Sequence, residues 1–170
     1  MRGLRESLIE LIRRTSAEIP DDVQHGILRW LEQEKEGTIA KSMLEIIEKN
    51  IELAKRKSQP LCQDTGSILF YVDCPVGLNQ VEFEAEARDA VVEATKRGYL
   101  RQNSVDSITG KNDGTNLGPG SPNMHFHQHA TDEIQVRLML KGGGCENVGA
   151  QFSLPNTALK ANRDLDGCRK

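Results

Sequence analysis

The spacing of apolar residues changes at Pro60, and this change restricts the chain to folds that combine helices with a sheet. Before Pro60, apolar residues recur every three or four positions, which predicts three helices within residues 1–58. After it, the short apolar run Ser67–Val72 lies between turn signals and predicts a buried strand. Helical spacing returns at 80–97, and another strand is expected at about 133–140. The order predicts an α+β domain in which N-terminal helices pack with a small mixed or antiparallel sheet.

Local signals set the expected limits of the helices. The dipeptide Ile19–Pro20 ends the first helix, because proline disfavours a helical conformation in the residue before it. Asp21 or Asp22 is expected to cap the second helix and Thr38 the third, since such side chains accept hydrogen bonds from free backbone N–H groups. We expect these helices to act in packing, with the second turning four apolar residues inward: Val23, Ile27, Trp30 and Leu31.

Composition and charge exclude several classes of function. The net charge of −3 gives no general attraction to nucleic acid or to an anionic membrane. No run approaches the roughly 18 apolar residues that a membrane span needs, and the charged N-terminus does not read as a signal peptide. A cytoplasmic protein with reduced thiols is therefore expected. The four cysteines are far apart and form no C-x-x-C pair, so they suit a metal cluster, a catalytic role or simple burial: Cys62, Cys74, Cys145 and Cys168.

Three polar motifs carry most of the chemical information. The cysteine motif, Pro60–Gly66, places a thiol, an amide, a carboxylate and a hydroxyl in one turn, which suits a soft metal and a polar ligand. The glycine motif, Lys141–Asn147, would let the backbone approach an anion after a strand. In the arginine motif, Leu100–Asp106, Arg101 follows a helix end and could grip a carboxylate. A turn with a buried cysteine, a flexible hairpin end and a solvated arginine are the simpler alternatives.

Two other features of the sequence each have more than one interpretation. Residues 98–122 form a long loop rich in Gly, Asn, Asp and Ser, which is unusual unless the loop is functional or disordered. His125, His127 and His129 alternate, so a strand would place the three rings on one face, where they could hold a divalent metal. No acidic or cysteine partner lies nearby in the sequence, and a solvated or partner-facing strand is the alternative.

Together the three motifs resemble the α subunits of two-chain class I fumarases and the related L-tartrate dehydratases. The matching text is PLCQDTG, LRQNSVD and KGGGCEN with the trailing VGAQFSLP, in the family's order. The resemblance extends from about residue 20 onward and is strongest over residues 60–155.

The resemblance implies a hydro-lyase that carries a [4Fe–4S] cluster. Such an enzyme hydrates fumarate reversibly to malate, or dehydrates a related hydroxy-dicarboxylate such as tartrate. Three thiolates hold the cluster, and its open iron acts as a Lewis acid. By position, Cys62 is one cluster ligand, Gln63 and Asp64 contact the substrate, and Asp64 is a candidate for acid–base catalysis. Arg101 would pair with a substrate carboxylate, and Gly144 would contact the substrate through its backbone.

The resemblance also implies that the site is shared with other parts of an enzyme. The family's next cluster ligand follows a helix that we expect to begin near Asp164, and Cys145 is not a ligand because related one-chain fumarases carry Ser there. Residues 1–170 are thus expected to form a single domain, the N-terminal part of an α subunit truncated before the remaining cluster cysteines and inactive alone. A β subunit partner and homo-oligomeric pairing of α are implied. The alternatives are a partner-binding subunit without a cluster and a histidine-based metal-binding module.

Overall fold

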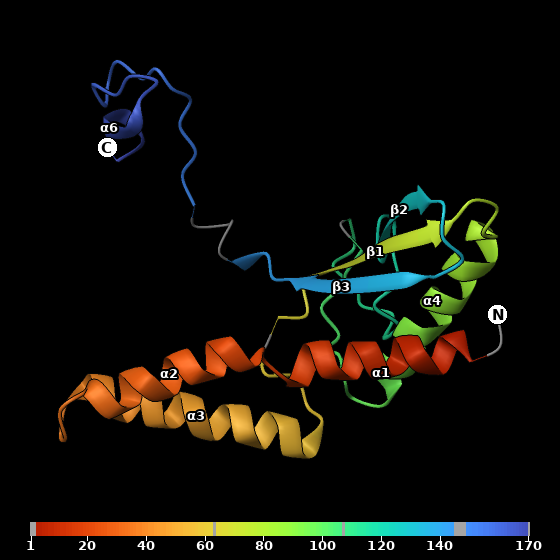
Figure 1. Ribbon diagram of the computed structural model, residues 1–170, viewed down its shortest axis with the longest axis horizontal. Helices are drawn as coiled ribbons and strands as arrows, with labels where there is room; N and C mark the ends of the chain where they lie inside the picture. The colour runs from red at the N-terminus through yellow and green to blue at the C-terminus, as the bar shows by residue number, and fades with distance from the viewer. Residues whose placement is uncertain (1–2, 63, 107, 145–148, 170) are drawn as a thin grey trace.

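The computed structural model describes residues 3–62, 64–106, 108–144 and 149–169. Within these ranges, a mixed three-stranded sheet packs against two long helices, two further long helices form a hairpin, and a one-turn helix lies near the C-terminus (Figure 1). The elements are α1 (Leu4–Ala17), α2 (Asp21–Gln33), α3 (Ile39–Lys57), β1 (Ser67–Pro75), α4 (Gln80–Lys96), β2 (Asn123–His129), β3 (Gln135–Lys141) and α6 (Leu165–Cys168). The strand order is β2-β1-β3, with β2 parallel and β3 antiparallel to β1. The predicted α+β class with a small mixed sheet is confirmed.

The core lies between α1, α4 and one face of the sheet. Side chains along β1 alternate between the two faces of the sheet, so that Ile68, Phe70 and Val72 are buried against the helices. Full burial of each such side chain stabilises the fold by about 1.5–3 kcal/mol. Helix α4 presents small alanines on its buried side, which allow close packing against α1: Ala87, Ala90 and Ala94.

The ends of α4 follow from local chemistry, and its C-terminal end leads into the arginine motif. Asn79 caps the first turn, its side chain accepting a hydrogen bond of 3.2 Å from the N–H of Glu82. The helix ends at Lys96, and Gly98, two residues later, turns the chain with a φ of +77°. The N–H of Tyr99 then bonds back to the carbonyl of Ala94 at 2.9 Å. The next residue, Leu100, is buried, and this fixes where Arg101 leaves the core.

The predicted caps of α2 and α3 had different outcomes. Thr38 caps α3 as expected, with its hydroxyl accepting from the N–H of Lys41 at 3.2 Å. The prediction for α2 was wrong, because Pro20 is its N-cap and no side chain caps it. Asp21 and Asp22 instead occupy the first turn, where their negative charges favour the positive end of the helix dipole.

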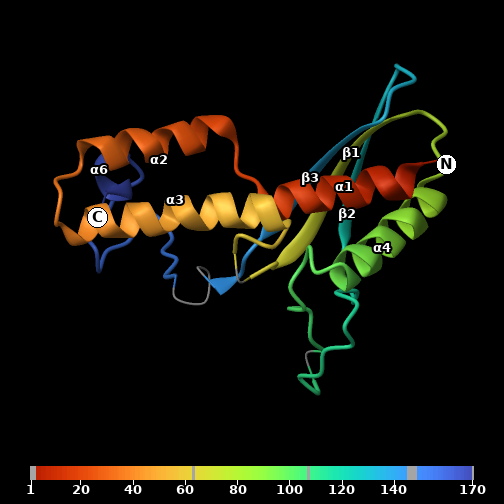
Figure 2. The same cartoon turned by 90° about the horizontal axis from the view of Figure 1, so that it is seen from below.

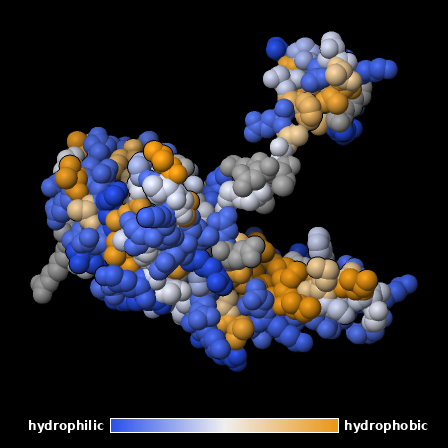
Figure 3. Space-filling view, turned by 180° about the vertical axis from the view of Figure 1, so that it is seen from behind, coloured by the Kyte–Doolittle hydropathy of each residue, from blue (hydrophilic) through white to orange (hydrophobic). Residues whose placement is uncertain are grey.

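Helices α2 and α3 form a hairpin that extends beyond the sheet (Figure 2). The prediction that α2 turns its apolar residues inward was wrong, since Trp30 is 68% exposed and none of the helix's residues is buried. The reason is that α2 packs against α3, whose own apolar residues are also largely uncovered. Figure 3 shows apolar residues gathered over this hairpin. The exposed large apolar side chains of the two helices are Val23, Trp30, Ile39, Met43, Ile46, Ile47 and Leu53.

Strand β2 was expected only conditionally, and it carries the three alternating histidines. Its sequence is polar, so the hydrophobic pattern did not predict a strand, and pairing with β1 determines its structure.

Strand β3 lies within one or two residues of the predicted limits. Asp164 caps α6, accepting from the N–H of Gly167 at 2.7 Å, so the expected helix start is confirmed. Among the described helices, none has the length and apolar character needed to cross a membrane.

Candidate active site

The cysteine and glycine motifs meet where β1 begins and β3 ends. Antiparallel pairing places Ser67 opposite Lys141, so the residue before β1 lies against the residues that follow β3. That residue is Gly66, with a φ of +63°. A Cβ atom at Gly66 would overlap the backbone carbonyl of Lys141. Both the backbone conformation and the close approach therefore require glycine at this position.

The turn that carries Cys62 is tied to the end of α1. The N–H of Leu61 donates to the carbonyl of Ser16 at 2.9 Å. Cys62 itself is exposed, and its sulfur accepts the N–H of Asp64 at 3.5 Å. Backbone N–H groups also donate hydrogen bonds to the sulfur atoms of cysteines that hold iron–sulfur clusters. The geometry presents a single thiol outward from a fixed turn.

Asp64 joins the cysteine motif to the glycine motif. Its Oδ1 accepts the N–H of Gly66 at 2.8 Å, and its Oδ2 accepts the N–H of Gly143 at 3.1 Å. The second bond spans 79 residues of sequence. A Cβ atom at Gly142 would lie 3.1 Å from Oδ2, which is tighter than an ordinary contact. Asp64 is therefore held in one orientation, and each oxygen retains a further acceptor position.

Thr65 joins the cysteine motif to the arginine motif. Its hydroxyl accepts the N–H of Arg101 at 2.8 Å, and its own N–H donates to Oδ1 of Asn103 at 3.1 Å. Thr65 is 4% exposed, and both bonds are partly buried. The side chain of Arg101 is exposed, and within the described ranges its guanidinium makes no hydrogen bond or ion pair. The backbone of Arg101 is thus fixed while its charged group remains available.

Two neighbouring hollows open around these motifs and share Pro60. One, of about 180 Å³, is lined by residues that include Cys62, Asp64 and Gly142. The other, of about 310 Å³, is lined by Arg101 together with Gln59, Pro60, Gly98, Leu100 and Gln102. The thiol and the guanidinium therefore open onto adjacent depressions of one surface.

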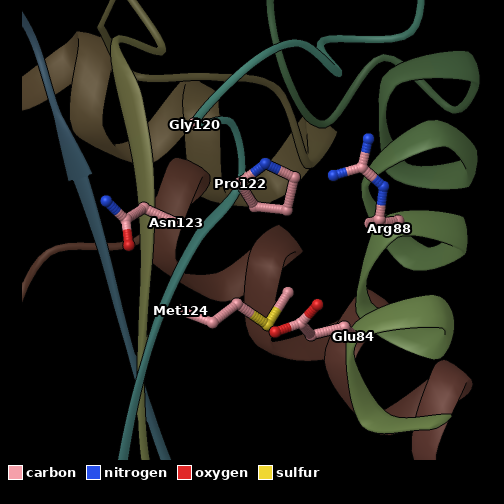
Figure 4. Close-up of a pocket in the computed structure, with 6 residues that line it drawn as sticks. All are labelled: Glu84, Arg88, Gly120, Pro122, Asn123 and Met124. Atoms are coloured by element: carbon pink, nitrogen blue, oxygen red, sulfur yellow. The ribbon is translucent and has the colours of Figure 1, made fainter. Parts of the chain in front are cut away.

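A separate hollow of about 250 Å³ lies between α4 and the start of β2 (Figure 4). Glu84 from the helix and Met124 from the strand extend toward each other across it (Figure 4). None of the residues predicted to act in catalysis or binding lines this hollow.

The other predicted site residues differ in how much the structure shows. Gly144 is exposed directly after Gly143, at the end of the glycine run. Gln63 and Cys145 lie outside the described residues. Asn103 was not predicted to have a role, and Thr65 was expected to face a polar ligand rather than to connect two motifs. The hydroxyl of Thr65 within a polar turn was the only signal in the sequence.

The described residues fit only part of an iron–sulfur site. Cys74 is fully buried in the core, and Cys168 lies on α6 at the end of the chain. Within the described ranges, no three His, Cys, Asp or Glu side chains are placed to hold a metal ion together. A [4Fe–4S] cluster requires several cysteine thiolates, so Cys62 alone does not hold one.

The three alternating histidines have separate partners. The ring of His125 stacks on Tyr71 with centroids 4.9 Å apart. Nδ1 of His127 lies 3.5 Å from a carboxylate oxygen of Asp73, and Nδ1 of His129 lies 2.8 Å from the hydroxyl of Thr131. The rings therefore do not converge on a common point.

Comparison with known proteins adds independent evidence. The family model for fumarate hydratase (Fumerase) matches residues 5–169. The chain belongs to this family. It is therefore a member of a family of hydro-lyases, as the three motifs suggested.

Individual relatives agree with the family match. The chain is 47% identical, over its whole length, to a Geobacillus stearothermophilus protein provisionally named fumarate hydratase class I, and it spans 34% of that protein. It is 29% identical to the L(+)-tartrate dehydratase subunit alpha of Escherichia coli K12, covering 84% of this chain and 47% of that one. The chain thus spans about a third to a half of the length of these relatives, corresponding to their N-terminal part.

Proposed function

We propose that this chain is the part of an iron–sulfur hydro-lyase α subunit that supplies one cluster thiolate and part of a dicarboxylate-binding surface. The reaction is the reversible hydration of fumarate to malate, or the dehydration of a related hydroxy-dicarboxylate such as tartrate. The observation that carries the proposal is the hydrogen bond of 3.1 Å between Asp64 and the N–H of Gly143. It brings together two motifs that were expected to face the same substrate.

Each predicted site residue that the structure describes has a proposed role that fits its placement, and the role of Gln63 rests on the resemblance alone. Arg101 receives a substrate carboxylate, since an exposed planar guanidinium can form two parallel hydrogen bonds with it. Asp64 contacts the substrate and exchanges a proton with it through the acceptor positions that the backbone leaves open. Gln63 and Gly144 provide further contacts, Gly144 through its backbone.

The cofactor in this proposal is a [4Fe–4S] cluster, with Cys62 as one of its ligands. Because the described residues contribute one suitable thiol, the remaining ligands come from other parts of the enzyme. The subunit naming of the tartrate dehydratase relatives supports a β subunit as a partner. Pairing of α subunits is a further part of the proposal. The alternative role of a partner-binding subunit without a cluster is favoured by the exposed apolar side chains of the α2–α3 hairpin.

The test is the iron content of cysteine variants in the assembled enzyme, prepared without oxygen. Cys62→Ser should lose most of its iron, because a hydroxyl is a poor substitute for a soft thiolate. Cys168→Ser is the matched control, since Cys168 is also exposed but lies on α6, and its iron should stay at the wild-type level. Cys145→Ser should likewise retain iron. Full iron in Cys62→Ser, or equal loss in all three variants, would contradict the proposed ligand.

A further inference from the structure

Asn116 is a buried polar residue in the middle of the long loop between α4 and β2. It is 1% exposed, although the loop around it is largely open to water. Its φ of +58° lies in the left-handed region, which asparagine adopts more readily than most residues other than glycine. The burial and the conformation both indicate a specific task for this side chain.

The amide of Asn116 uses all of its hydrogen-bonding capacity. Its Oδ1 accepts the N–H groups of Asn103 at 3.0 Å and Ser104 at 3.2 Å. Its Nδ2 donates to the carbonyl of Arg101 at 2.8 Å and to the hydroxyl of Thr95, on α4, at 3.1 Å. A side-chain amide offers two donors and two acceptor positions, so none is left over. Three of the four bonds go to the backbone of the arginine motif.

The backbone of Arg101 is consequently held on both sides by buried side chains. Thr65 accepts its N–H at 2.8 Å, and Asn116 donates to its carbonyl at 2.8 Å. Both side chains are at most 4% exposed, and the two bonds are partly buried. These two bonds fix the backbone position from which the exposed side chain of Arg101 extends.

We propose that Asn116 is a positioning residue that fixes Arg101 for the substrate carboxylate. The inference rests on the proposed function, because it assigns Asn116 to the same dicarboxylate site. It also assigns a role to the long loop, which places the buried amide of Asn116 against the backbone of the arginine motif. A guanidinium on a mobile backbone loses the alignment needed for two parallel hydrogen bonds.

The first test is amide hydrogen exchange in the chain itself, which needs no activity. In Asn116→Asp the acceptor for Asn103 and Ser104 is kept, but an oxygen replaces the donor that faces the carbonyl of Arg101. Exchange over residues 101–104 should rise at least tenfold. Asn112→Asp is the matched control in the same loop, because Asn112 is exposed and water replaces the bond it donates. Unchanged exchange in Asn116→Asp would overturn the inference.

A second variant guards against a general loss of folding caused by a buried charge. Asn116→Gly keeps the left-handed conformation without adding charge and removes all four side-chain bonds. It should show the same local rise in exchange while the amides of β1 remain protected. If exchange rises equally along the whole chain, Asn116 is a general stability residue and the inference fails.

The second test is a double-mutant cycle on kcat/KM in the assembled enzyme. Asn116→Asp should raise KM for the dicarboxylate about tenfold or more in the wild-type background, with iron per chain unchanged. It should have little further effect in an Arg101→Lys background, because residues that act through one another are non-additive. Additive losses would overturn the inference and leave the proposed function standing. If the wild-type assembly neither binds nor converts a dicarboxylate, the proposed function fails and this inference fails with it.

Discussion

Replacement of Gly66 by alanine tests whether the cysteine and glycine motifs are held together as described. Gly66 has a φ of +63°, and its Cβ would overlap the carbonyl of Lys141. The matched control is Gly110→Ala, because Gly110 has a φ of +66° and open space where a Cβ would go. The two substitutions share the backbone cost and differ in the overlap.

The expected magnitudes follow from these two contributions. A left-handed conformation costs a non-glycine residue about 1–2 kcal/mol, and alanine returns about 0.4–1 kcal/mol by restricting the unfolded chain. Gly110→Ala should therefore lower the free energy of unfolding by about 0–1.6 kcal/mol. Gly66→Ala adds about 1–3 kcal/mol for the overlap, since the neighbouring backbone has to move. At about 2–4 °C for each kcal/mol, its Tm should lie about 2–12 °C below that of the control.

The assay is thermal and urea unfolding of both variants and the wild type, followed by far-ultraviolet circular dichroism. Equal stability of the two variants would show that the carbonyl of Lys141 does not close on Gly66, and the link between the motifs would be refuted. A larger loss in Gly66→Ala with a normal spectrum before unfolding supports the described contact.

Two further predictions concern the assembled enzyme. Arg101→Lys should lower kcat/KM about 10²-fold in steady-state kinetics with fumarate and tartrate, because lysine keeps the charge but not the planar guanidinium. If the variant has wild-type kinetics, Arg101 is only a solvated surface residue. Gly144→Ala should fold normally, since a Cβ there meets no atom within 4 Å, but its KM should rise because the substrate approaches this backbone. An unchanged KM together with a normal circular dichroism spectrum would show that Gly144 is not part of the site.

The sequence predicted elements well where apolar periodicity was strong. The spacing in α4 and the apolar run of β1 gave the limits of these elements to within a few residues. Prediction from sequence failed where tertiary contacts determine whether a residue is buried or a strand forms. The amphipathic pattern of α2 predicted burial, yet a pattern specifies only that a face is apolar and does not provide a partner. The polar strand β2 depends on pairing with β1, which its own residues do not reveal.

The candidate site shows the same division. The motifs identified Cys62, Asp64 and Arg101 as candidates without any structure, because their chemistry stands out in short stretches. Asn116 could not be recognised, since asparagine is common in polar loops and its partners lie up to 21 residues away. Its burial arises only when the loop folds back against α4.

The polar residues of the motifs and of the loop that contacts them fall into two groups. Asp64, Thr65 and Asn116 direct their side chains to backbone groups elsewhere in the motifs, so folding accounts for these hydrogen bonds. Cys62 and Arg101 present a thiol and a guanidinium outward, and folding within the described residues gives no reason for that chemistry. Under the proposed function, the cluster and the substrate carboxylate would account for the second group. The bonds of the first group would then hold Cys62 and Arg101 at the separation that the site requires.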